Sequence, residues 1–212
     1  ESIRNELEEI SSFVNSDKEL KTNIKKLEKE YSDIAIQLSS KREKISGILS
    51  SLIEDSLKEL NMSGANFEIK ISRKAKSIGS INLTNESAQG FPKGIDQVEF
   101  FLSANPGEPL KPMASIASGG EMSRIMLAIK TVFQDQNPVS ALIFDEIDTG
   151  ISGETAKKVS QHLKKLSNHK QVICITHLPQ IAKQADRHLH ISKHVKNAKT
   201  FVYAEYLEGA KS

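Results

Sequence analysis

The sequence predicts an α/β fold in which an N-terminal coiled-coil arm precedes a parallel sheet with flanking helices and a small antiparallel sheet. Three observations predict this fold. Apolar residues recur in steps of four and three over residues 3–60, short stretches then alternate apolar with polar residues, and the remainder alternates between helical and buried-strand patterns. We expect the arm to cover residues 1–60 and the globular part to cover residues 61–212.

The composition of the 212 residues is typical of a folded protein with long solvated helices, because 38% are hydrophobic, 26% are charged and only 5% are aromatic. The net charge of +2 neither indicates nor excludes binding to nucleic acid. A single cysteine, Cys174, excludes an internal disulfide, and no apolar run is long enough to cross a membrane. We therefore expect a cytoplasmic protein with no membrane partner. Because the chain starts at Glu1 inside a helical pattern, we also expect it to be part of a longer protein.

The arm is predicted from its heptad pattern. Ser16 and Glu19 form a capping-box pattern, which predicts that one helix ends near residues 15–19 and that a second helix begins there. A helix over residues 20–60 would be roughly 60 Å long with a narrow apolar face, so it needs a partner helix. A two-helix unit inside a globular domain is the alternative, but the charged flanks favour an exposed rod. The apolar seam consists of Leu20, Ile24, Leu27, Tyr31, Ile34, Leu38, Ile45, Ile48 and Leu52, after a shorter run of Ile3, Leu7, Ile10 and Val14.

The arm is expected to end within residues 61–64, where Gly64 would supply a left-handed cap. Residues 67–71 and 98–104 alternate apolar with polar residues, so they predict two strands of a small antiparallel sheet, each with one solvated face. The polar residues 72–95 predict a loop, and its lysines are typical of a solvated surface.

The parallel sheet is predicted from two continuous apolar runs, residues 141–144 and 172–176, which are typical of strands covered on both faces. The segment between them places Ala156, Val159, Leu163 and Leu166 on one helical face, so the three elements form a βαβ unit. Residues 178–186 then predict a short helix, and residues 187–207 predict a terminal hairpin.

Two adjacent glycines, Gly119 and Gly120, begin the helix that precedes this unit. Ser118 and Glu121 match a capping box, but a cap does not need two residues that raise the entropic cost of folding. Glycines at a helix start allow close approach of an anion to backbone N–H groups, so the pair indicates a phosphate contact. A plain cap with a tight turn is the alternative.

The first buried strand is followed by the carboxylates of Asp145 and Glu146, with Asp148 close behind. Ligands bind at this edge of α/β sheets, and we expect Asp145 to hold Mg²⁺ and Glu146 to act as a general base. Capping of the next helix by aspartate would explain one carboxylate but not all three. Because parallel strands end at the same edge, His177 should lie beside Glu146, where it could bond a phosphate or orient a water molecule.

Other patterns are weaker. His188, His190 and His194 lack the further ligands typical of a metal site, and Ala117 stands where a serine-hydrolase elbow requires glycine. The chain contains no G-x-x-x-x-G-K-[ST] loop, which a nucleotide site built on such carboxylates requires. We therefore expect the site to be incomplete in this chain.

These motifs together resemble those of ABC-type ATPases. Residues 118–121 resemble the signature motif, 141–146 the Walker B strand, 148–152 the D-loop, and His177 the switch histidine. The flanking residues 105–130, 141–153 and 175–182 are similar to the RecN family of bacterial, SMC-like DNA-repair ATPases, and the resemblance extends over residues 45–207. Ala117 stands where the signature often has leucine, and Ser152 stands where many D-loops have aspartate.

The resemblance implies that the chain is the C-terminal half of an ABC-type ATPase head, joined through an antiparallel coiled coil to an N-terminal half that holds the Walker A loop. ATP and Mg²⁺ are the implied cofactors. The resemblance also implies that Asp145 positions Mg²⁺, Glu146 activates water and His177 senses the γ-phosphate. The implied nucleotide contacts, partly made to ATP held by a second head, are Ser118, Gly119, Gly120, Glu121, Asp148 and Ser152.

The implied function is ATP-driven head dimerisation and hydrolysis, coupled to DNA binding or tethering in double-strand-break repair. We expect a homodimer in the bacterial cytoplasm, associated with the nucleoid, and no hydrolysis by this chain alone. A structural, cohesin-like tethering module in which ATP acts only as a clamp is one alternative, and an SMC-like head with another task is a second. No residue is assigned to DNA.

Overall fold

The structure is a computed structural model, and it describes residues 2–75, 80–82, 87–116, 119–136, 138–196 and 198–207. The chain forms two compact units. Unit 1 consists of Glu1–Ile48 and Ile69–Glu99, and unit 2 consists of Leu49–Glu68 and Phe100–Ser212. The predicted division between an arm (1–60) and a globular part (61–212) stays a prediction.

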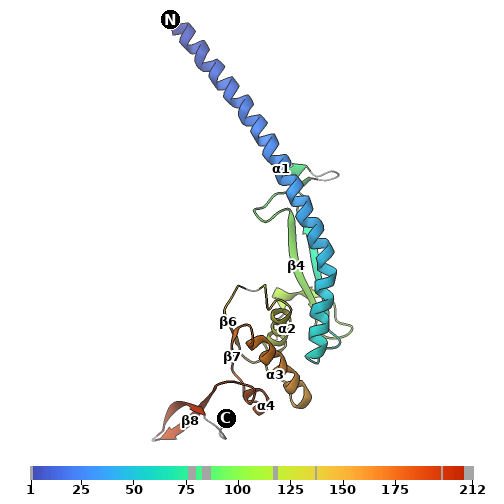
Figure 1. The fold of residues 1–212 in the computed structure, drawn as a ribbon, viewed down its shortest axis with the longest axis vertical. Helices are drawn as coiled ribbons and strands as arrows, with labels where there is room; N and C mark the ends of the chain where they lie inside the picture. Colours follow the sequence, from blue (N-terminus) through green and yellow to red (C-terminus); the bar gives the residue numbers. More distant parts are fainter. Residues whose placement is uncertain are drawn as a thin grey trace. The chain divides into compact units, whose positions relative to one another are not determined.

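The arm is a single helix, α1 (Ser2–Glu59), which Figure 1 draws as one unbroken ribbon. The predicted break near residues 15–19 is therefore wrong. This stretch contains no glycine or proline, and Lys21 pairs with Asp17 at 2.6 Å across one turn. The hydroxyl of Thr22 also donates to the carbonyl of Lys18 at 2.8 Å. These contacts favour continuation of the helix over the capping tendency of Ser16.

The end of α1 lies where the sequence predicts it, but a different residue forms the cap. Asn61 takes the left-handed conformation (φ 63°), and the Met62 and Asn61 amides donate to the carbonyls of Leu57 and Lys58 at 3.0 and 3.1 Å. This pattern is a Schellman motif. The expectation that Gly64 supplies the left-handed residue is wrong. A side chain at Gly64 would instead overlap the ring of Pro106, so glycine is required there for close packing.

Two faces of α1 have different environments. One face is buried, and its residues include Ala35, Ser39, Ile53 and Leu57. The predicted heptad seam lies about a quarter turn away at 3.6 residues per turn. Tyr31 and Leu38 in this seam are half-buried, whereas its other residues between Leu20 (58% exposed) and Leu52 (50% exposed) remain exposed. A 58-residue helix with so many exposed apolar residues in its seam requires a partner, and within the described residues nothing covers those exposed ones.

The small antiparallel sheet has the strand order β1-β4-β5. Its strands are β1 (Asn66–Arg73), β4 (Asp96–Ser103) and β5 (Lys111–Pro112), and β4 pairs antiparallel with β5. Two shorter strands, β2 (Ser80–Asn82) and β3 (Ser87–Gln89), pair antiparallel inside the stretch predicted as a loop. Each of these strands contains a single apolar residue, Ile81 or Ala88, which is too few to form a recognisable alternation, so this pair was not predicted.

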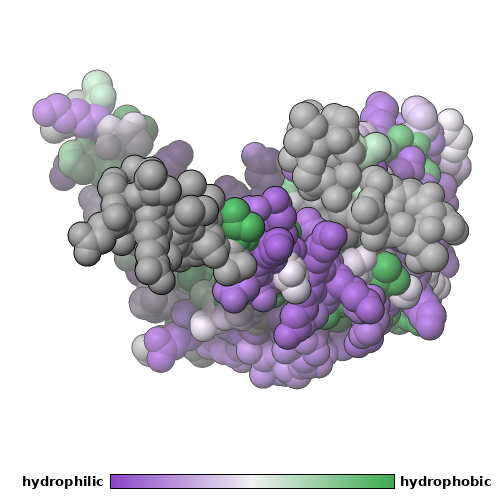
Figure 2. All heavy atoms as spheres, turned by 90° about the horizontal axis from the view of Figure 1, so that it is seen from above, coloured by the Kyte–Doolittle hydropathy of each residue, from purple (hydrophilic) through white to green (hydrophobic). Residues whose placement is uncertain are grey.

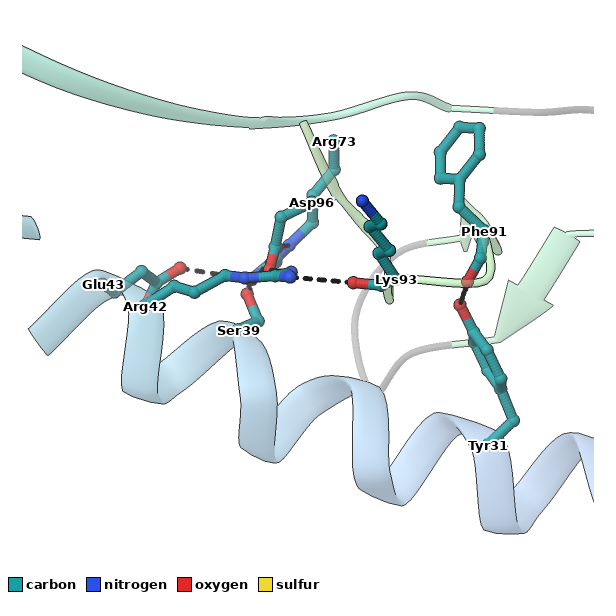
Figure 3. Close-up of polar contacts among 8 residues, drawn as sticks. All are labelled: Tyr31, Ser39, Arg42, Glu43, Arg73, Phe91, Lys93 and Asp96. Carbon is teal, nitrogen blue, oxygen red and sulfur yellow. Dashed lines mark hydrogen bonds and ion pairs between the residues drawn. The ribbon is translucent and has the colours of Figure 1, made fainter. Parts of the chain in front are cut away.

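Unit 1 contains a buried carboxylate between α1 and β4 (Figure 3). Asp96 has a fully buried side chain, and it accepts hydrogen bonds from Ser39 at 2.6 Å and from Arg42 at 2.8 Å. Arg73 lies 3.6 Å from the same carboxylate and 3.2 Å from Glu43. A second contact of α1 is the hydroxyl of Tyr31, which donates to the carbonyl of Phe91 at 2.8 Å. These bonds attach α1 to the residues around β4.

The predicted βαβ unit is confirmed in unit 2, where β6 (Ala141–Phe144) pairs parallel with β7 (Gln171–Cys174) through α3 (Gly153–Ser167). Helix α3 buries the four residues predicted for its apolar face. Before this unit come a 3₁₀ turn, η1 (Met113–Ser115), and α2 (Gly119–Val132), and the short helix α4 (Pro179–Ala182) follows it.

The expectation that β6 and β7 are covered on both faces is wrong for this chain. Phe144 is buried, but Ile143, Ile173 and Ile175 on the opposite face are 69%, 46% and 57% exposed. Apolar side chains on both faces of parallel strands indicate a sheet that is buried on both sides. Within the described residues, the second face lacks its cover.

The terminal hairpin is confirmed as β8 (His188–Lys196) paired antiparallel with β9 (Lys199–Leu207). Directly opposed residues share a face, so one face of the hairpin contains Leu189, Ile191, Val195, Val202 and Tyr206, all of them exposed.

Figure 2 shows mainly hydrophilic side chains on the face that it draws, with isolated hydrophobic ones between them. Among the described residues, no helix has the length and apolar character needed to span a membrane.

Candidate functional site

The candidate site lies at the carboxyl ends of β6 and β7. The two strands are in register from Ala141 opposite Gln171 to Phe144 opposite Cys174, and the Ile175 amide donates to the carbonyl of Phe144 at 2.9 Å. Asp145 and Glu146 follow β6, and Thr176 and His177 follow β7. The structure therefore brings these polar residues to one edge, as the parallel arrangement predicts.

Glu146 has an unusual backbone conformation. Its φ of 56° lies in the left-handed region, which is uncommon for a residue other than glycine. The turn is held by the Glu146 amide, which donates to Asp145 Oδ1 at 2.9 Å, and by the Thr149 amide, which donates to the Glu146 carbonyl at 3.1 Å. Both Asp145 and Glu146 remain exposed. A constrained and accessible carboxylate of this kind is typical of functional sites.

The first turn of α2 packs directly against this loop. A Cβ at Gly119 would overlap the carboxylate of Glu146, and a Cβ at Gly120 would lie 3.1 Å from the carbonyl oxygens of Glu146 and Thr149. Close packing against Glu146 and Thr149 therefore also explains why glycines occupy these two positions, in addition to the phosphate contact that the sequence indicated. Ser118, the remaining residue of the predicted motif, lies outside the described residues, so its capping box with Glu121 is not described either.

Two further bonds join α2 to the loop. The Ser123 hydroxyl donates to the Asp145 carbonyl at 2.8 Å, and the buried Arg124 donates to the Thr149 carbonyl at 3.0 Å. Burial lowers the pKa of Arg124, and the nearby Glu121 partly opposes this effect. Sequence reasoning missed Arg124. The available signal was a basic residue inside the apolar stretch of α2, next to Ile125.

Asp148 is a buried residue of the site whose carboxylate accepts hydrogen bonds from the end of β7. Its side chain is only 4% exposed, and its Oδ2 atom accepts the Thr176 hydroxyl at 2.5 Å and the His177 amide at 2.9 Å. His177 Nδ1 lies 3.1 Å from the same oxygen. Burial alone would raise the pKa of Asp148, but the bonds from Thr176 and His177 outweigh it and lower that pKa below its ordinary value.

The remaining predicted residues are placed as follows. The N-cap residue of α3 is Ser152, which makes no side-chain cap bond, so capping by aspartate does not explain the carboxylates. Within the described residues, no hydrogen bond or ion pair joins Glu146 to His177, although each of them follows one of two adjacent strands.

Beside Asp145, a groove of about 220 Å³ runs between α2 and β6, with Met126, Lys130 and Ile143 in its walls.

A metal site formed by protein side chains alone is not found in the described ranges, since no group of three or more His, Cys, Asp or Glu residues could hold an ion. Asp145 is therefore suited only to the type of Mg²⁺ site in which one carboxylate acts together with phosphate oxygens and water. Burial raises the pKa of Cys174 to about 11, with smaller contributions from Asp148 and Asp145, so its thiol stays protonated near neutral pH.

Comparison with known proteins gives a consistent set of similarities. The family model of the RecF/RecN/SMC N-terminal domain matches residues 2–200. The chain is 41% identical to the DNA repair protein RecN of Halalkalibacterium halodurans over 190 residues (88% of this chain, 32% of that protein). It is 39% identical to RecN of Treponema pallidum over 204 residues (96% and 34%) and 40% identical to RecN of Bacillus subtilis over 198 residues (91% and 34%). The chain thus spans about one third of the length of these curated relatives, between 32% and 34%.

Solved structures that resemble this chain include the Smc head domain with an extended coiled coil from Pyrococcus furiosus. That structure has 20% sequence identity and a TM-score of 0.48, and the match covers 88% of this chain and 44% of that chain. The SMC head domain from Thermotoga maritima has 18% identity and a TM-score of 0.36, and the match covers 76% of this chain and 51% of that chain.

Proposed function

The chain belongs to the RecF/RecN/SMC N-terminal domain family, and from this premise we propose that it is the C-terminal half of a RecN-like, SMC-type ATPase head that acts in DNA double-strand-break repair. The supporting observation is the edge shared by β6 and β7, where Asp145, Glu146 and His177 follow two adjacent parallel strands. Similarity to three RecN proteins at 39–41% identity supports the same assignment.

The nucleotide would be ATP with Mg²⁺. The exposed Asp145 is suited to hold the metal, because its carboxylate has an oxygen besides the one that accepts the Glu146 amide. Mg²⁺ would supply charge neutralisation on the β- and γ-phosphates when bound. The residues proposed to contact nucleotide, in part across a dimer of heads, are Ser118, Gly119, Gly120, Glu121, Asp148 and Ser152.

Glu146 is proposed as the general base. Its carboxylate is exposed, and the left-handed turn and the start of α2 fix its position. It would take a proton from water as the water oxygen bonds to the γ-phosphorus and the bond between that phosphorus and the ADP oxygen breaks. His177, with a side chain that is 75% exposed, would contact the γ-phosphate or the attacking water.

The first proposed partner is the N-terminal half-head of the same protein. The bare face of β6 and β7 supports this partner, because Ile143, Ile173 and Ile175 need an apolar cover that the described residues do not supply. The matching relatives are about three times as long as this chain, so they contain enough additional chain to form such a half. The Walker A loop that this chain lacks would belong to that half.

The arm supports the same architecture. The exposed seam of α1 from Leu20 to Leu52 requires a second apolar helix, which we propose is the outgoing helix of an antiparallel coiled coil. Two completed heads would enclose two ATP molecules, and closure would be coupled to binding or tethering of DNA. The assembly would work in the bacterial cytoplasm, associated with the nucleoid.

The alternative function is a cohesin-like tethering module in which ATP acts only as a clamp. The length of α1 is the observation that favours it, since 58 helical residues extend about 87 Å at 1.5 Å per residue. Deletion of one heptad, residues 21–27, keeps the phase of the seam. If this deletion reduces DNA bridging while phosphate release is unchanged, tethering is the main task.

The proposal is tested by phosphate release from the chain alone and from the protein completed by its natural N-terminal part. We expect hydrolysis only in the completed protein, and Glu146→Gln should abolish turnover while it preserves ATP-driven head pairing. Glu154→Gln, at an exposed position in the first turn of α3, is the matched control. Full hydrolysis by the chain alone would refute the half-head assignment, and normal turnover in Glu146→Gln would exclude Glu146 as the base.

A further inference from the structure

The bonding of Asp148 is one-sided, because two donors from the end of β7 converge on its Oδ2 atom and a ring nitrogen lies close to the same oxygen. The donors are the hydroxyl of Thr176 at 2.5 Å and the backbone amide of His177 at 2.9 Å. The ring Nδ1 of His177 lies 3.1 Å from the same oxygen. The carboxylate is 4% exposed, whereas the His177 side chain is 75% exposed. A buried acid therefore holds one edge of an imidazole whose other edge faces solvent.

The protonation of this pair follows from the donor and acceptor roles of the groups. The bonds from Thr176 and His177 outweigh burial and lower the pKa of Asp148, so its carboxylate is ionised near neutral pH. An ionised carboxylate only accepts hydrogen bonds. Because the carboxylate oxygen lies 3.1 Å from His177 Nδ1, a proton on Nδ1 is electrostatically favoured over a lone pair there, and in the neutral ring the lone pair is then on Nε2.

We propose that Asp148 is a positioning residue that holds His177 in the Nδ1–H tautomer, with Nε2 directed away from the protein. This inference rests on the proposed function, because His177 is the residue proposed there to contact the γ-phosphate or the attacking water. It revises the proposed role of Asp148, which would act through His177 and not by a direct contact with nucleotide. In the neutral ring, Nε2 accepts a hydrogen bond from water. In the protonated ring, Nε2–H donates to a phosphate oxygen, and Asp148 provides the opposite charge on the other side of the imidazole.

The surroundings of Asp148 support positioning over ligand binding. The Thr176 hydroxyl, which donates to Asp148, also accepts the Leu178 amide at 3.0 Å, so the carboxylate belongs to a closed set of bonds. Its own loop is fixed by Arg124, which donates to the carbonyl of the next residue, Thr149, at 3.0 Å. Asp148 thus joins the loop after β6 to the histidine after β7.

The tautomer is measured directly by long-range ¹H–¹⁵N correlation spectra of the chain labelled with ¹⁵N-histidine, at a pH where the ring is neutral. His177→Gln identifies the signal among the six histidines. We expect a protonated Nδ1 in the wild type. In Asp148→Ala the ring loses its acceptor and should shift mainly to the Nε2–H form, which free histidine favours.

Two variants separate positioning from loss of structure. Thr176→Val removes a different donor from Asp148 and should leave His177 in the Nδ1–H form. Asp148→Asn keeps an oxygen acceptor and should retain part of the Nδ1–H population. Unchanged signals of the other histidines show that the fold is intact. A wild-type His177 with its proton on Nε2, or an Asp148→Ala variant with an unchanged tautomer, overturns the proposal.

The role in the reaction is tested separately in the completed protein. We expect Asp148→Ala to lower kcat for ATP hydrolysis by about 10- to 100-fold with a much smaller effect on KM, and Asp148→Asn to restore part of the loss. If the tautomer changes and kcat does not, positioning for catalysis is refuted while the proposed function stands. If the wild type hydrolyses no ATP, the proposed function fails, and the tautomer result still decides what Asp148 does to His177.

Discussion

The carboxylate of Glu146 occupies the space that a Cβ on Gly119, the first residue of α2, would need. The proposed general base and the start of α2 are therefore adjacent within one chain. Any side chain at position 119 would occupy the place of the carboxylate, so this contact restricts residue 119 to glycine in the arrangement observed.

Gly119→Ala should separate stability from activity. The atom displaced is the end of a flexible side chain, so we expect the free energy of unfolding to change by no more than about 0.5 kcal/mol. Hydrolysis by the completed protein should fall about tenfold or more, because Glu146 has to move. The control is Gly47→Ala in α1, where a Cβ meets nothing within 4 Å. That variant should gain about 0.5–1 kcal/mol in urea unfolding and keep full activity. Normal hydrolysis in Gly119→Ala would contradict the prediction.

Gly120→Ala should instead destabilise the fold. Its Cβ would lie 2.9 Å from the Cβ of Thr149 and 3.1 Å from two carbonyl oxygens, and the backbone has to shift to make room. We expect a loss of about 1–3 kcal/mol in urea unfolding. An unfolding midpoint equal to that of Gly119→Ala would show that the loop after β6 yields more easily than this geometry indicates.

His162 should make the stability of unit 2 depend on pH. Its side chain is 9% exposed, and its Nε2 lies 2.8 Å from Glu59 Oε2. Burial lowers the pKa of His162, Glu59 opposes this effect, and Lys165 adds to it. Because the unfolded chain binds the proton more readily, stability is complete above the ordinary pKa of 6.5 and is lost as the pH falls from there to the lower pKa of the folded state.

The measurement is urea unfolding at several pH values above and below 6.5, with hydrogen exchange of α3 as the local probe. The stability of the wild type should fall by at most about 1.4 kcal/mol per pH unit, and His162→Gln should remove most of this slope. His169→Gln, at an exposed position, is the control and should retain it. Equal slopes in the two variants would assign the pH dependence to other groups.

Asp96→Asn should loosen the attachment of α1 in unit 1. The fully buried carboxylate accepts bonds from Ser39 and Arg42. Its loss leaves Arg42 without this anion and removes one of the two carboxylates near Arg73, which keeps Glu43. We expect a loss of about 3 kcal/mol, seen as faster hydrogen exchange in β4. Asp33→Asn, on the exposed side of α1, should have no such effect. Similar exchange in both variants would mean that the apolar contacts of Ala35 and Ile95 are sufficient.

Ile173→Lys should prevent association with the N-terminal half while it leaves this chain folded. The side chain lies on the bare face of β7, so its replacement removes little packing within the chain, and we expect a change of about 0.5 kcal/mol or less. Co-purification with a separately expressed N-terminal half should be lost. Val98→Lys, at a similarly exposed position on β4, is the control. Normal co-purification of Ile173→Lys would place the interface elsewhere.

The spacing of apolar residues along the chain was sufficient to predict several helices and strands. The seam of α1, the parallel strands β6 and β7 and the buried face of α3 all follow from spacing along the chain, and the position of His177 follows from the parallel arrangement. The break near Ser16 was wrong because a capping box states only a preference, which the ion pair of Lys21 with Asp17 and the lack of a helix breaker override.

The contacts that sequence could not predict join residues far apart in the chain. Gly64 packs against Pro106, Arg124 bonds to Thr149, and Asp148 bonds to His177. Each depends on a three-dimensional approach of two loops or helices, and spacing along the chain contains no information about it. The contact that requires glycine at position 119 was missed in the same way, because the carboxylate involved belongs to Glu146, which is 27 residues further along the chain (146 minus 119).

The isoleucine row on β6 and β7 also affects how the isolated chain behaves in solution. Two copies could cover Ile143, Ile173 and Ile175 against each other, which would remove the same apolar area from water. Attraction of this kind weakens on cooling. Preparations of the separate half should therefore cluster when warmed and disperse again on ice, so handling temperature will determine whether single molecules are observed.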